Sequence, residues 1–328
     1  MPDIPTGVSG VSAASAPGLV PLTATSDGRF VSGRDGVAAI ATTGDRKVEF
    51  VDFGRHELAL VRSALGYPAY YPVHAVAVER PVKAVLMDLD GTSVRSEPFW
   101  IWMIQLTTAS LAGDPAFELE DADLPHVSGH SVSEHLDYCI RKYCPGRTVE
   151  EARALYFQHT HREVAEILAG RGRRDAFVPA PGLEDFLRAL KARGIKVGLV
   201  TSGLHEKAYP EIVAAFGALT LGDPRAFYDA IITAGFPLRR GEVGTLGELS
   251  PKPHPWLYAE VCRVGLGIPF EERHSVVGIE DSGAGICAIR LAGFAAIGIA
   301  GGNIESSGTR GLCAAYCPSL ADVLPLIS

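Results

Sequence analysis

The chain has 328 residues, which at roughly 150 residues per domain predicts about two domains. Its 30 lysines and arginines face 38 aspartates and glutamates, giving a formal net charge of −8. This acidic balance excludes the basic surface that non-specific nucleic-acid binding needs, and we expect no nucleic-acid partner. With 47% hydrophobic and 21% charged residues, the composition is typical of a globular protein.

Residues 1–28 are rich in serine, alanine, glycine, proline and threonine without periodicity, so they are predicted to be a flexible tail. Residues 29–80 predict a small α/β extension of unknown role. It contains strand-like runs at 37–41 and 48–53 and a helical pattern at 56–65. The N-terminus lacks the basic and apolar segments of a signal peptide, and no apolar run has membrane-spanning length. We therefore expect a cytoplasmic protein without a membrane partner.

From residue 81 onward, short apolar runs rich in β-branched residues alternate with amphipathic segments. The predicted strands are 83–87, 196–200, 230–232, 275–279 and, more weakly, 295–299. The predicted helices between them are 183–194, 205–217, 255–265 and 284–293. This alternation predicts an α/β fold with a Rossmann-like, doubly wound parallel sheet covered by helices on both faces.

About a hundred residues separate the first two of these strands, far more than a simple crossover needs. Their pattern is almost entirely helical, with predicted helices at 98–113, 131–144 and 149–170. We therefore expect a helical domain at 95–179, inserted into a core formed by residues 81–94 and 180–328.

The first core strand ends in the sequence MDLDGT, which carries Asp88 and Asp90. In an open parallel sheet, ligands bind beyond the carboxyl ends of the strands, so both carboxylates are expected to face one crevice. Gly91 permits the sharp turn that follows. Two paired acids need a shared proton or a cation, and Mg²⁺ prefers such oxygen ligands. An ordinary Asp/Gly turn is the competing interpretation.

Three further sequence segments carry side chains that suit a phosphate- or metal-binding site. Thr201 and Ser202 follow the second strand, where a hydroxyl and free N–H groups can bind a phosphoryl oxygen. Lys252 lies between two prolines that fix the local backbone, and its charge suits a phosphate. Glu280 and Asp281 end another strand before a glycine-rich turn. Taken alone, Lys252 is better explained as a solvated loop lysine.

Together these segments resemble the haloacid dehalogenase-like (HAD) hydrolase superfamily, subfamily I with a helical C1-type cap. The resemblance covers roughly residues 81–328. It rests on four motifs in the family's order, DLDGT (88–92), TSG (201–203), KP (252–253) and GIEDSGAG (278–285). It implies that the helical insert is the cap, which closes over the substrate and determines specificity.

The resemblance also implies the role of each residue. Asp88 is the nucleophile that becomes an aspartyl phosphate, and Asp90 is the general acid and base. Mg²⁺ is held by the Asp88 carboxylate, the Asp90 carbonyl and Asp281, with Glu280 acting through water or behind these ligands. Thr201 binds the phosphoryl group together with N–H groups near Leu89, Asp90 and Ser202. Lys252 neutralises the nucleophile and the developing charge.

Several reactions of the family are disfavoured by particular residues. Dehalogenases lack the second acid of the first motif, whereas Asp90 is present. Phosphonoacetaldehyde hydrolases use a cap lysine, and Val132 stands at the comparable position. β-Phosphoglucomutases carry a hinge histidine and a cap arginine where this chain has Trp100 and Val132.

The favoured function is therefore a Mg²⁺-dependent phosphatase that hydrolyses a small phosphorylated metabolite, such as a sugar or polyol phosphate, through an aspartyl phosphate. A β-phosphoglucomutase-like hexose-phosphate mutase is the first alternative. A non-catalytic phospho-ligand-binding protein or scaffold, with residues 29–80 as its partner surface, is the alternative of another class.

Two residues at the start of the cap are candidate substrate contacts. Arg95 follows the first motif closely and is long enough to reach a phosphate or a sugar hydroxyl. Trp100 competes with the commoner role of an aromatic residue in a helical core. The sequence assigns neither the substrate, nor the oligomeric state, nor a purpose for the long loop 235–250.

Overall fold

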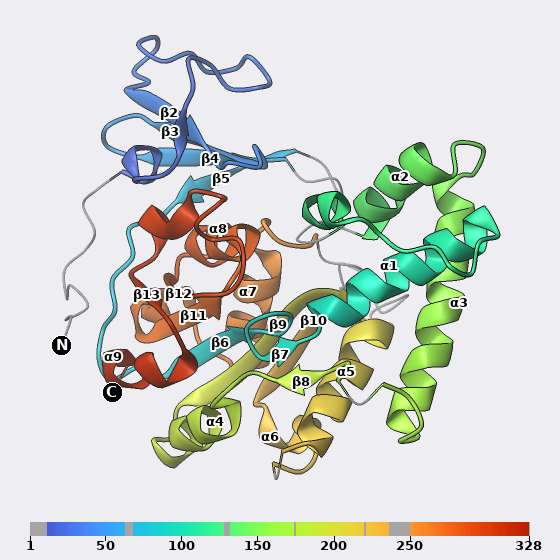
Figure 1. The fold of residues 1–328 in the computed structure, drawn as a ribbon. Coiled ribbons are helices and arrows are strands. Elements are labelled where there is room, and N and C mark those ends of the chain that lie inside the picture. The colour runs from blue at the N-terminus through green and yellow to red at the C-terminus, as the bar shows by residue number, and fades with distance from the viewer. Residues whose placement is uncertain are drawn as a thin grey trace, which may run out of the picture. The chain divides into compact units, whose positions relative to one another are not determined.

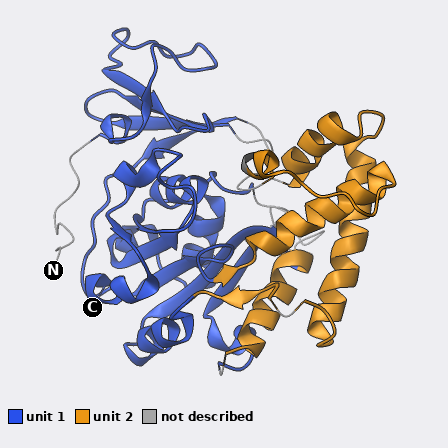
Figure 2. Cartoon of the chain, viewed as in Figure 1, with its two compact units in different colours: residues 1–93, 181–205, 221–328 blue, residues 94–180, 206–220 orange. Residues whose placement is uncertain are grey.

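The computed structural model describes residues 12–62, 68–127, 132–173, 175–219, 221–235 and 250–327. Most of the loop 235–250 and residues 1–11 of the predicted tail therefore lie outside the described residues. Contacts within the chain define two compact units, coloured blue and orange in Figure 2. Unit 1 comprises residues 1–93, 181–205 and 221–328, and unit 2 comprises residues 94–180 and 206–220.

The centre of unit 1 is a six-stranded sheet in the order β10-β9-β6-β11-β12-β13 (Figure 1). Every neighbouring pair in it is parallel. Its strands are β6 (Ala84–Asp88), β9 (Lys196–Leu204), β10 (Ala230–Gly235), β11 (Val276–Glu280), β12 (Ala295–Ile299) and β13 (Ala315–Cys317). The predicted Rossmann-like parallel sheet is confirmed, and so are all five predicted strands.

The burial of the central strands explains why they could be predicted. Every residue of β6, β11 and β12 is buried, as expected for a parallel sheet that is covered on both faces. Such strands have continuous apolar sequences rather than alternating ones. Strand β13 was not predicted, because three residues with mixed burial carry too little pattern.

The described helices of unit 1 lie between its strands or after the last of them. They are α4 (Leu183–Ala192), α6 (Pro224–Phe227), α7 (Trp256–Glu260), α8 (Gly283–Leu291) and α9 (Leu324–Ile327), and a π-helical turn continues α7 over Val261–Gly265. In α4, Leu183, Phe186, Leu187 and Leu190 recur at helical spacing and are all buried. Helix α8 begins where the Ser282 hydroxyl accepts a hydrogen bond from the Gly285 N–H. Short 3₁₀ turns occupy Ala13–Ser15, Asp121–His126, Phe270–Ser275, Thr309–Leu312 and Leu320–Asp322.

The N-terminal extension is an antiparallel sheet in its described part, not the α/β structure that the sequence predicts. Its strands, in spatial and chain order, are β1 (Val20–Pro21), β2 (Ala39–Thr42), β3 (Val48–Asp52), β4 (Glu57–Val61) and β5 (Ala69–Val73). The predicted helix at 56–65 is wrong over Glu57–Val61. Its leucines and alanine favour a helix, but β4 pairs with β3 on one side and β5 on the other.

The N-terminal sheet and the parallel sheet share one hydrophobic core. Phe50 and Val61 of the extension belong to the same buried cluster as Ile286 and Ile289 of α8. The tail prediction is wrong for residues 12–28, because Ala13 and Ala14 are also buried in this cluster and β1 pairs with β2. The extension is therefore an integral part of unit 1.

Unit 2 contains α1 (Glu97–Ala112), α2 (Val132–Tyr143), α3 (Val149–Leu168), most of α5 (His205–Gly217), and the strands β7 (Val94–Arg95) and β8 (Val178–Pro179). The three helices predicted in the insert are found within two residues of their expected bounds. Helix α3 starts with a capping box between Thr148 and Glu151. Segment 206–220, which we placed in the core, belongs instead to unit 2, where Trp100 Nε1 donates to Glu211 Oε2 at 3.2 Å.

None of the helices among the described residues combines the length and apolarity that crossing a lipid bilayer requires.

The close approach of the N-terminal extension to Gly308 gives a first prediction. A Cβ atom at Gly308 (φ +72°) would lie 2.1 Å from the Gly18 carbonyl oxygen, whereas one at Gly28 (φ +71°) meets nothing within 4 Å. Gly28→Ala should lower the free energy of unfolding by about 1–2 kcal/mol, because of its left-handed backbone alone. Gly308→Ala should lower the free energy of unfolding by about 1–3 kcal/mol more than Gly28→Ala, because its Cβ atom clashes with the Gly18 carbonyl oxygen. Equal losses in the midpoints of thermal unfolding would contradict this close approach.

Candidate active site

Three adjacent strands bring the predicted site residues to one edge of the sheet. Strand β6 lies between β9 and β11 and is parallel to both (Figure 1). Asp88 is the last residue of β6, Glu280 is the last residue of β11, and Thr201 lies near the end of β9. Because parallel strands end at the same edge, these residues meet where ligands bind in open α/β sheets.

The centre of this edge is a cluster of buried carboxylates. Oxygen atoms of Asp88, Glu280 and Asp281 all lie within 4.8 Å of one another. Asp88 is 5% exposed, Asp281 is 9% exposed, and Glu280 is completely buried. Burial of like charges at this spacing requires compensation by protons or cations.

Glycines leave the space that these carboxylates occupy. A Cβ atom at Gly91, which has φ +87°, would lie 2.1 Å from Asp281 Oδ2. A Cβ atom at Gly285 would lie 1.8 Å from Glu280 Oε1. The glycines of the first and last motifs therefore allow the backbone to approach the acids, in addition to the turning role that the sequence indicates for Gly91.

Lys252 supplies a positive charge inside the cluster. Its Nζ forms ion pairs with Asp88 Oδ1 and, at 2.5 Å, with Glu280 Oε1. Its side chain is only 7% exposed. Burial by itself lowers the pKa of Lys252, but the two carboxylates outweigh it and raise this pKa above its usual range. The sequence alone favours a solvated loop lysine at this position, and the burial of Lys252 excludes that interpretation.

Both oxygens of Glu280 are engaged by the protein. Oε1 accepts hydrogen bonds from Lys252 and from the Tyr258 hydroxyl at 3.1 Å. Oε2 accepts from the Asp281 N–H at 3.1 Å, and from the Ser282 N–H and hydroxyl at 3.0 and 2.9 Å. Glu280 thus orients Lys252 and the loop that carries Asp281, rather than presenting a free oxygen.

The electrostatics of the cluster favour a bound cation. Burial, followed by the charge of Glu280, raises the pKa of Asp88 well above its usual range. The same two causes raise the pKa of Asp281 to about 7. One ammonium group faces three carboxylates of the cluster, so a negative charge remains when all three are ionised. Oxygen donors with excess negative charge suit Mg²⁺, and the residues present therefore fit this ion.

The hydroxyl-bearing segment lies beside these acids. Thr201 Oγ1 donates to Asp90 Oδ2 at 3.3 Å and accepts from the Gly203 N–H at 2.9 Å. The Lys252 N–H donates to Ser202 Oγ at 3.1 Å. This hydrogen bond connects the lysine loop, residues 251–255, to the end of β9. Leu89 is 1% exposed, so its side chain is part of the core. The structure thus joins five of the polar residues predicted for the core site in one network, namely Asp88, Ser202, Lys252, Glu280 and Asp281, and it pairs Thr201 with Asp90.

Three residues of this network were not predicted. Thr92 Oγ1 donates to Asp281 Oδ1 at 3.1 Å, and Ser93 Oγ donates to the Asp88 carbonyl at 2.5 Å. Thr92 is the last residue of the first motif and Ser93 follows it directly, so their positions in the sequence indicate both hydroxyls. Tyr258 carried no signal, because an aromatic residue in an amphipathic helix is normally a core residue.

The two cap candidates have different surroundings within unit 2. Arg95 is exposed on β7, where its backbone pairs with Val178. Trp100 is 9% exposed, and Lys207 Nζ lies 3.8 Å from the centre of its ring. Trp100 therefore packs and hydrogen-bonds as part of the helical core of unit 2. Substrate contact by either residue stays a prediction.

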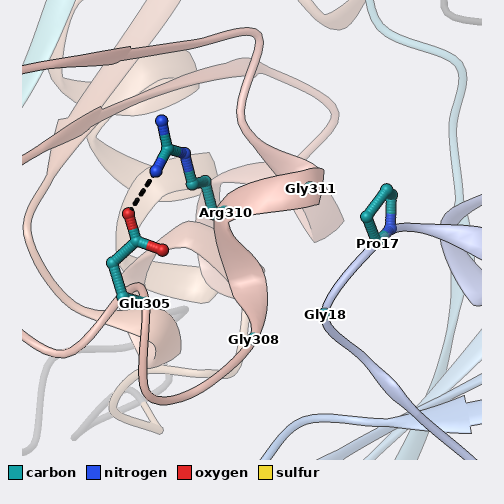
Figure 3. A pocket seen from close by; sticks show the side chains of 6 residues that line it. All are labelled: Pro17, Gly18, Glu305, Gly308, Arg310 and Gly311. Carbon is teal, nitrogen blue, oxygen red and sulfur yellow. Dashed lines mark hydrogen bonds and ion pairs between the residues drawn. The ribbon is translucent and has the colours of Figure 1, made fainter.

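A pocket of about 460 Å³ lies elsewhere in unit 1 (Figure 3). It is lined by Pro17, Gly18, Glu305, Gly308, Arg310 and Gly311. Arg310 Nη1 pairs with Glu305 Oε1 at 2.5 Å, so the charges of these two residues neutralise each other. The lining includes no residue of the acidic cluster, and the pocket does not alter the placement of the candidate site.

The family model for haloacid dehalogenase-like hydrolases matches residues 82–293. The chain belongs to this family. The match includes the strand ends and the loops that carry the acidic cluster, Thr201 and Lys252, while the N-terminal sheet lies outside it. No curated protein matches the chain.

Solved structures of this hydrolase family share the fold at low sequence identity. CbbY from Rhodobacter sphaeroides in complex with phosphate is 21% identical with a TM-score of 0.54, covering 74% of this chain and 96% of its own. A predicted phosphoglycolate phosphatase from Haemophilus somnus is 18% identical with a TM-score of 0.58, and the coverages are 76% and 99%. A phosphonoacetaldehyde hydrolase-like protein from Oleispira antarctica is 17% identical with a TM-score of 0.55, and the coverages are 75% and 91%.

The carboxylate cluster gives a prediction for metal binding. Saturating Mg²⁺ should stabilise the wild-type protein by about 2–3 kcal/mol at a hundredfold excess over the dissociation constant. Asp281→Asn should remove this increment, because it removes an anionic ligand from the cluster. Asp322→Asn, an exposed acid of the same unit, should keep it. Thermal unfolding with and without Mg²⁺ measures the increment, and an increment that survives in Asp281→Asn would contradict the assignment.

Proposed function

We propose that the protein is a Mg²⁺-dependent phosphatase that hydrolyses a small phosphomonoester, with a sugar or polyol phosphate as the substrate class. The observation that carries this proposal is the buried contact of Lys252 Nζ with Asp88 and Glu280 beside Asp281. Phosphoryl transfer depends mainly on positioning and on charge neutralisation, and this arrangement supplies both.

In the first step, an Asp88 carboxylate oxygen attacks the phosphorus atom. The bond between phosphorus and the leaving oxygen breaks, and Asp90 gives its proton to that oxygen. The products of this step are the free alcohol and an aspartyl phosphate at Asp88. The hydrogen bond from Thr201 Oγ1 to Asp90 Oδ2 supports these roles, because it joins the proposed acid to the hydroxyl proposed to bind the phosphate.

In the second step, Asp90 accepts a proton from water, and the water oxygen attacks the same phosphorus atom. The bond between phosphorus and the Asp88 oxygen breaks, which releases inorganic phosphate and regenerates the carboxylate. Lys252 remains paired with Asp88 during both transfers, so the charge of the nucleophile is balanced without solvent.

The Asp88 carboxylate, the Asp90 carbonyl and Asp281 would hold the Mg²⁺ ion, which would supply positive charge to the phosphoryl oxygens. Glu280 is better suited to orient Lys252 and the Asp281 loop, since both of its oxygens already accept hydrogen bonds. The N–H groups near Leu89, Asp90 and Ser202, with Lys252, complete the proposed phosphate site.

A mutase is the second candidate function, and Trp100 argues against it. The residue that replaces the expected hinge histidine is buried in unit 2 and donates its indole N–H to Glu211. An indole N–H can only donate and cannot relay a proton as an imidazole does. Water, rather than a sugar hydroxyl, is therefore the proposed acceptor of the phosphoryl group.

The nucleophile assignment is tested by Asp88→Asn with p-nitrophenyl phosphate and Mg²⁺. Turnover should fall by at least about a thousandfold, the scale on which loss of a catalytic nucleophile acts. Asp137→Asn on α2 removes an exposed acid that pairs with Arg141 and should leave turnover unchanged. Full activity of pure Asp88→Asn protein, or a wild-type protein that is inactive with Mg²⁺, would refute the proposal.

Product analysis separates the phosphatase from the mutase. With β-glucose 1-phosphate as the substrate, the protein should release inorganic phosphate faster than it forms glucose 6-phosphate. Both products can be followed in one reaction by phosphate detection and by a coupled dehydrogenase assay. Faster formation of glucose 6-phosphate would favour the mutase instead.

A further inference from the structure

The side chain of Tyr71 on β5 connects the N-terminal sheet to the lysine loop. The Tyr71 hydroxyl lies 2.8 Å from Nδ1 of His254, two residues after Lys252. Trp256 Nε1 donates to the same hydroxyl at 3.1 Å. The Tyr71 ring also meets the rings of His254 and Trp256 edge-on, with centroids 5.7 and 5.9 Å apart. Contacts among Tyr71, His254 and Trp256 thus connect the N-terminal extension to the segment that carries Lys252.

The chemistry of these groups sets the direction of the hydrogen bond between Trp256 and Tyr71. An indole N–H can only donate, so the Tyr71 oxygen accepts from Trp256. In the neutral His254 ring, Nδ1 either accepts the Tyr71 hydroxyl proton or donates its own proton to the Tyr71 oxygen, and both tautomers keep this hydrogen bond. His254 is 2% exposed, and burial lowers its pKa, which favours this neutral form. The Tyr71 hydroxyl is the partner that holds the orientation of this buried ring.

The backbone between His254 and Lys252 is stiff. Pro251, Pro253 and Pro255 alternate with Lys252 and His254, and each proline ring fixes its own φ angle. The His254 N–H donates to the Pro251 carbonyl at 3.1 Å, which closes a turn around Lys252. This turn connects the backbone of His254 to that of Lys252, whose Nζ is paired with both Asp88 and Glu280.

We propose that Tyr71 is a positioning residue for Lys252, and that the N-terminal sheet is thereby a working part of the phosphoryl-transfer site. The proposal rests on the proposed phosphatase function. Tyr71 lies outside residues 82–293, which the family model matches, so the positioning element is an addition of this chain to the common core. Its contribution is expected in the transition state, where the charge of Lys252 counts most.

Tyr71→Phe and Tyr70→Phe form a matched pair of variants. Tyr70 is the neighbouring residue on β5, and its hydroxyl bonds Asp27 instead of the lysine loop. With p-nitrophenyl phosphate and Mg²⁺, Tyr71→Phe should lower kcat about three- to tenfold, the equivalent of one hydrogen bond, with little change in KM. Tyr70→Phe should leave kcat within about twofold, and the two variants should unfold at similar temperatures.

A double-mutant cycle tests whether Tyr71 acts through His254. His254→Leu removes the hydrogen-bond partner of the Tyr71 hydroxyl on this loop, so adding Tyr71→Phe to it should lower kcat no further. Additive losses would overturn the proposal, because the two residues would then act independently.

The outcomes for the inference and for the function differ. If the wild-type protein is active and Tyr71→Phe has the same kcat as Tyr70→Phe, the inference is overturned and the proposed phosphatase function is not affected. A wild-type protein without phosphatase activity would overturn the proposed function and this inference with it.

Discussion

The ion pairs of one buried ammonium group with two carboxylates are the interaction on which the rest of unit 1 depends. Lys252 Nζ contacts Asp88 and Glu280, and Asp281 lies in the same cluster. Because burial penalises each of these charges, the site is stable only when every group has a partner. The order of strands β9, β6 and β11 brings the acids together, and the glycines of the surrounding turns leave space for their oxygens. The remaining negative charge makes the cluster a fitting place for Mg²⁺ and, through it, for a phosphate, despite the net charge of −8.

The extension changes how this member of the haloacid dehalogenase-like hydrolases is held together. Its antiparallel sheet shares a buried core with α8, the helix that follows the acidic strand β11. Its fifth strand reaches the lysine loop through Tyr71. The part of the chain that the family model matches therefore packs against a sheet outside the match, and this sheet contacts the segment that carries Lys252.

Much of the parallel fold and most of the core site could be predicted, for reasons visible in particular residues. Fully buried strands such as β6 and β11 have apolar sequences that alternate with amphipathic helices, and their polar residues are confined to the ends. The leucines and alanine of β4 favour a helix, which is what the sequence predicts. The pairing of β4 with two neighbouring strands outweighs this preference. The role of Glu280 and the contact of Tyr71 with His254 could not be predicted. Both depend on partners far away in the sequence, which no local pattern records.

The central claim is that Asp88 receives the phosphoryl group during turnover. It is tested most directly by quenching the working enzyme in acid, where an acyl phosphate survives, and by locating the modification through mass spectrometry of its peptides. The account predicts that the peptide containing Asp88 gains one phosphoryl group when substrate and Mg²⁺ are both present. An active enzyme whose Asp88 peptide stays unmodified under these conditions, or which carries the phosphoryl group on another residue, would contradict it.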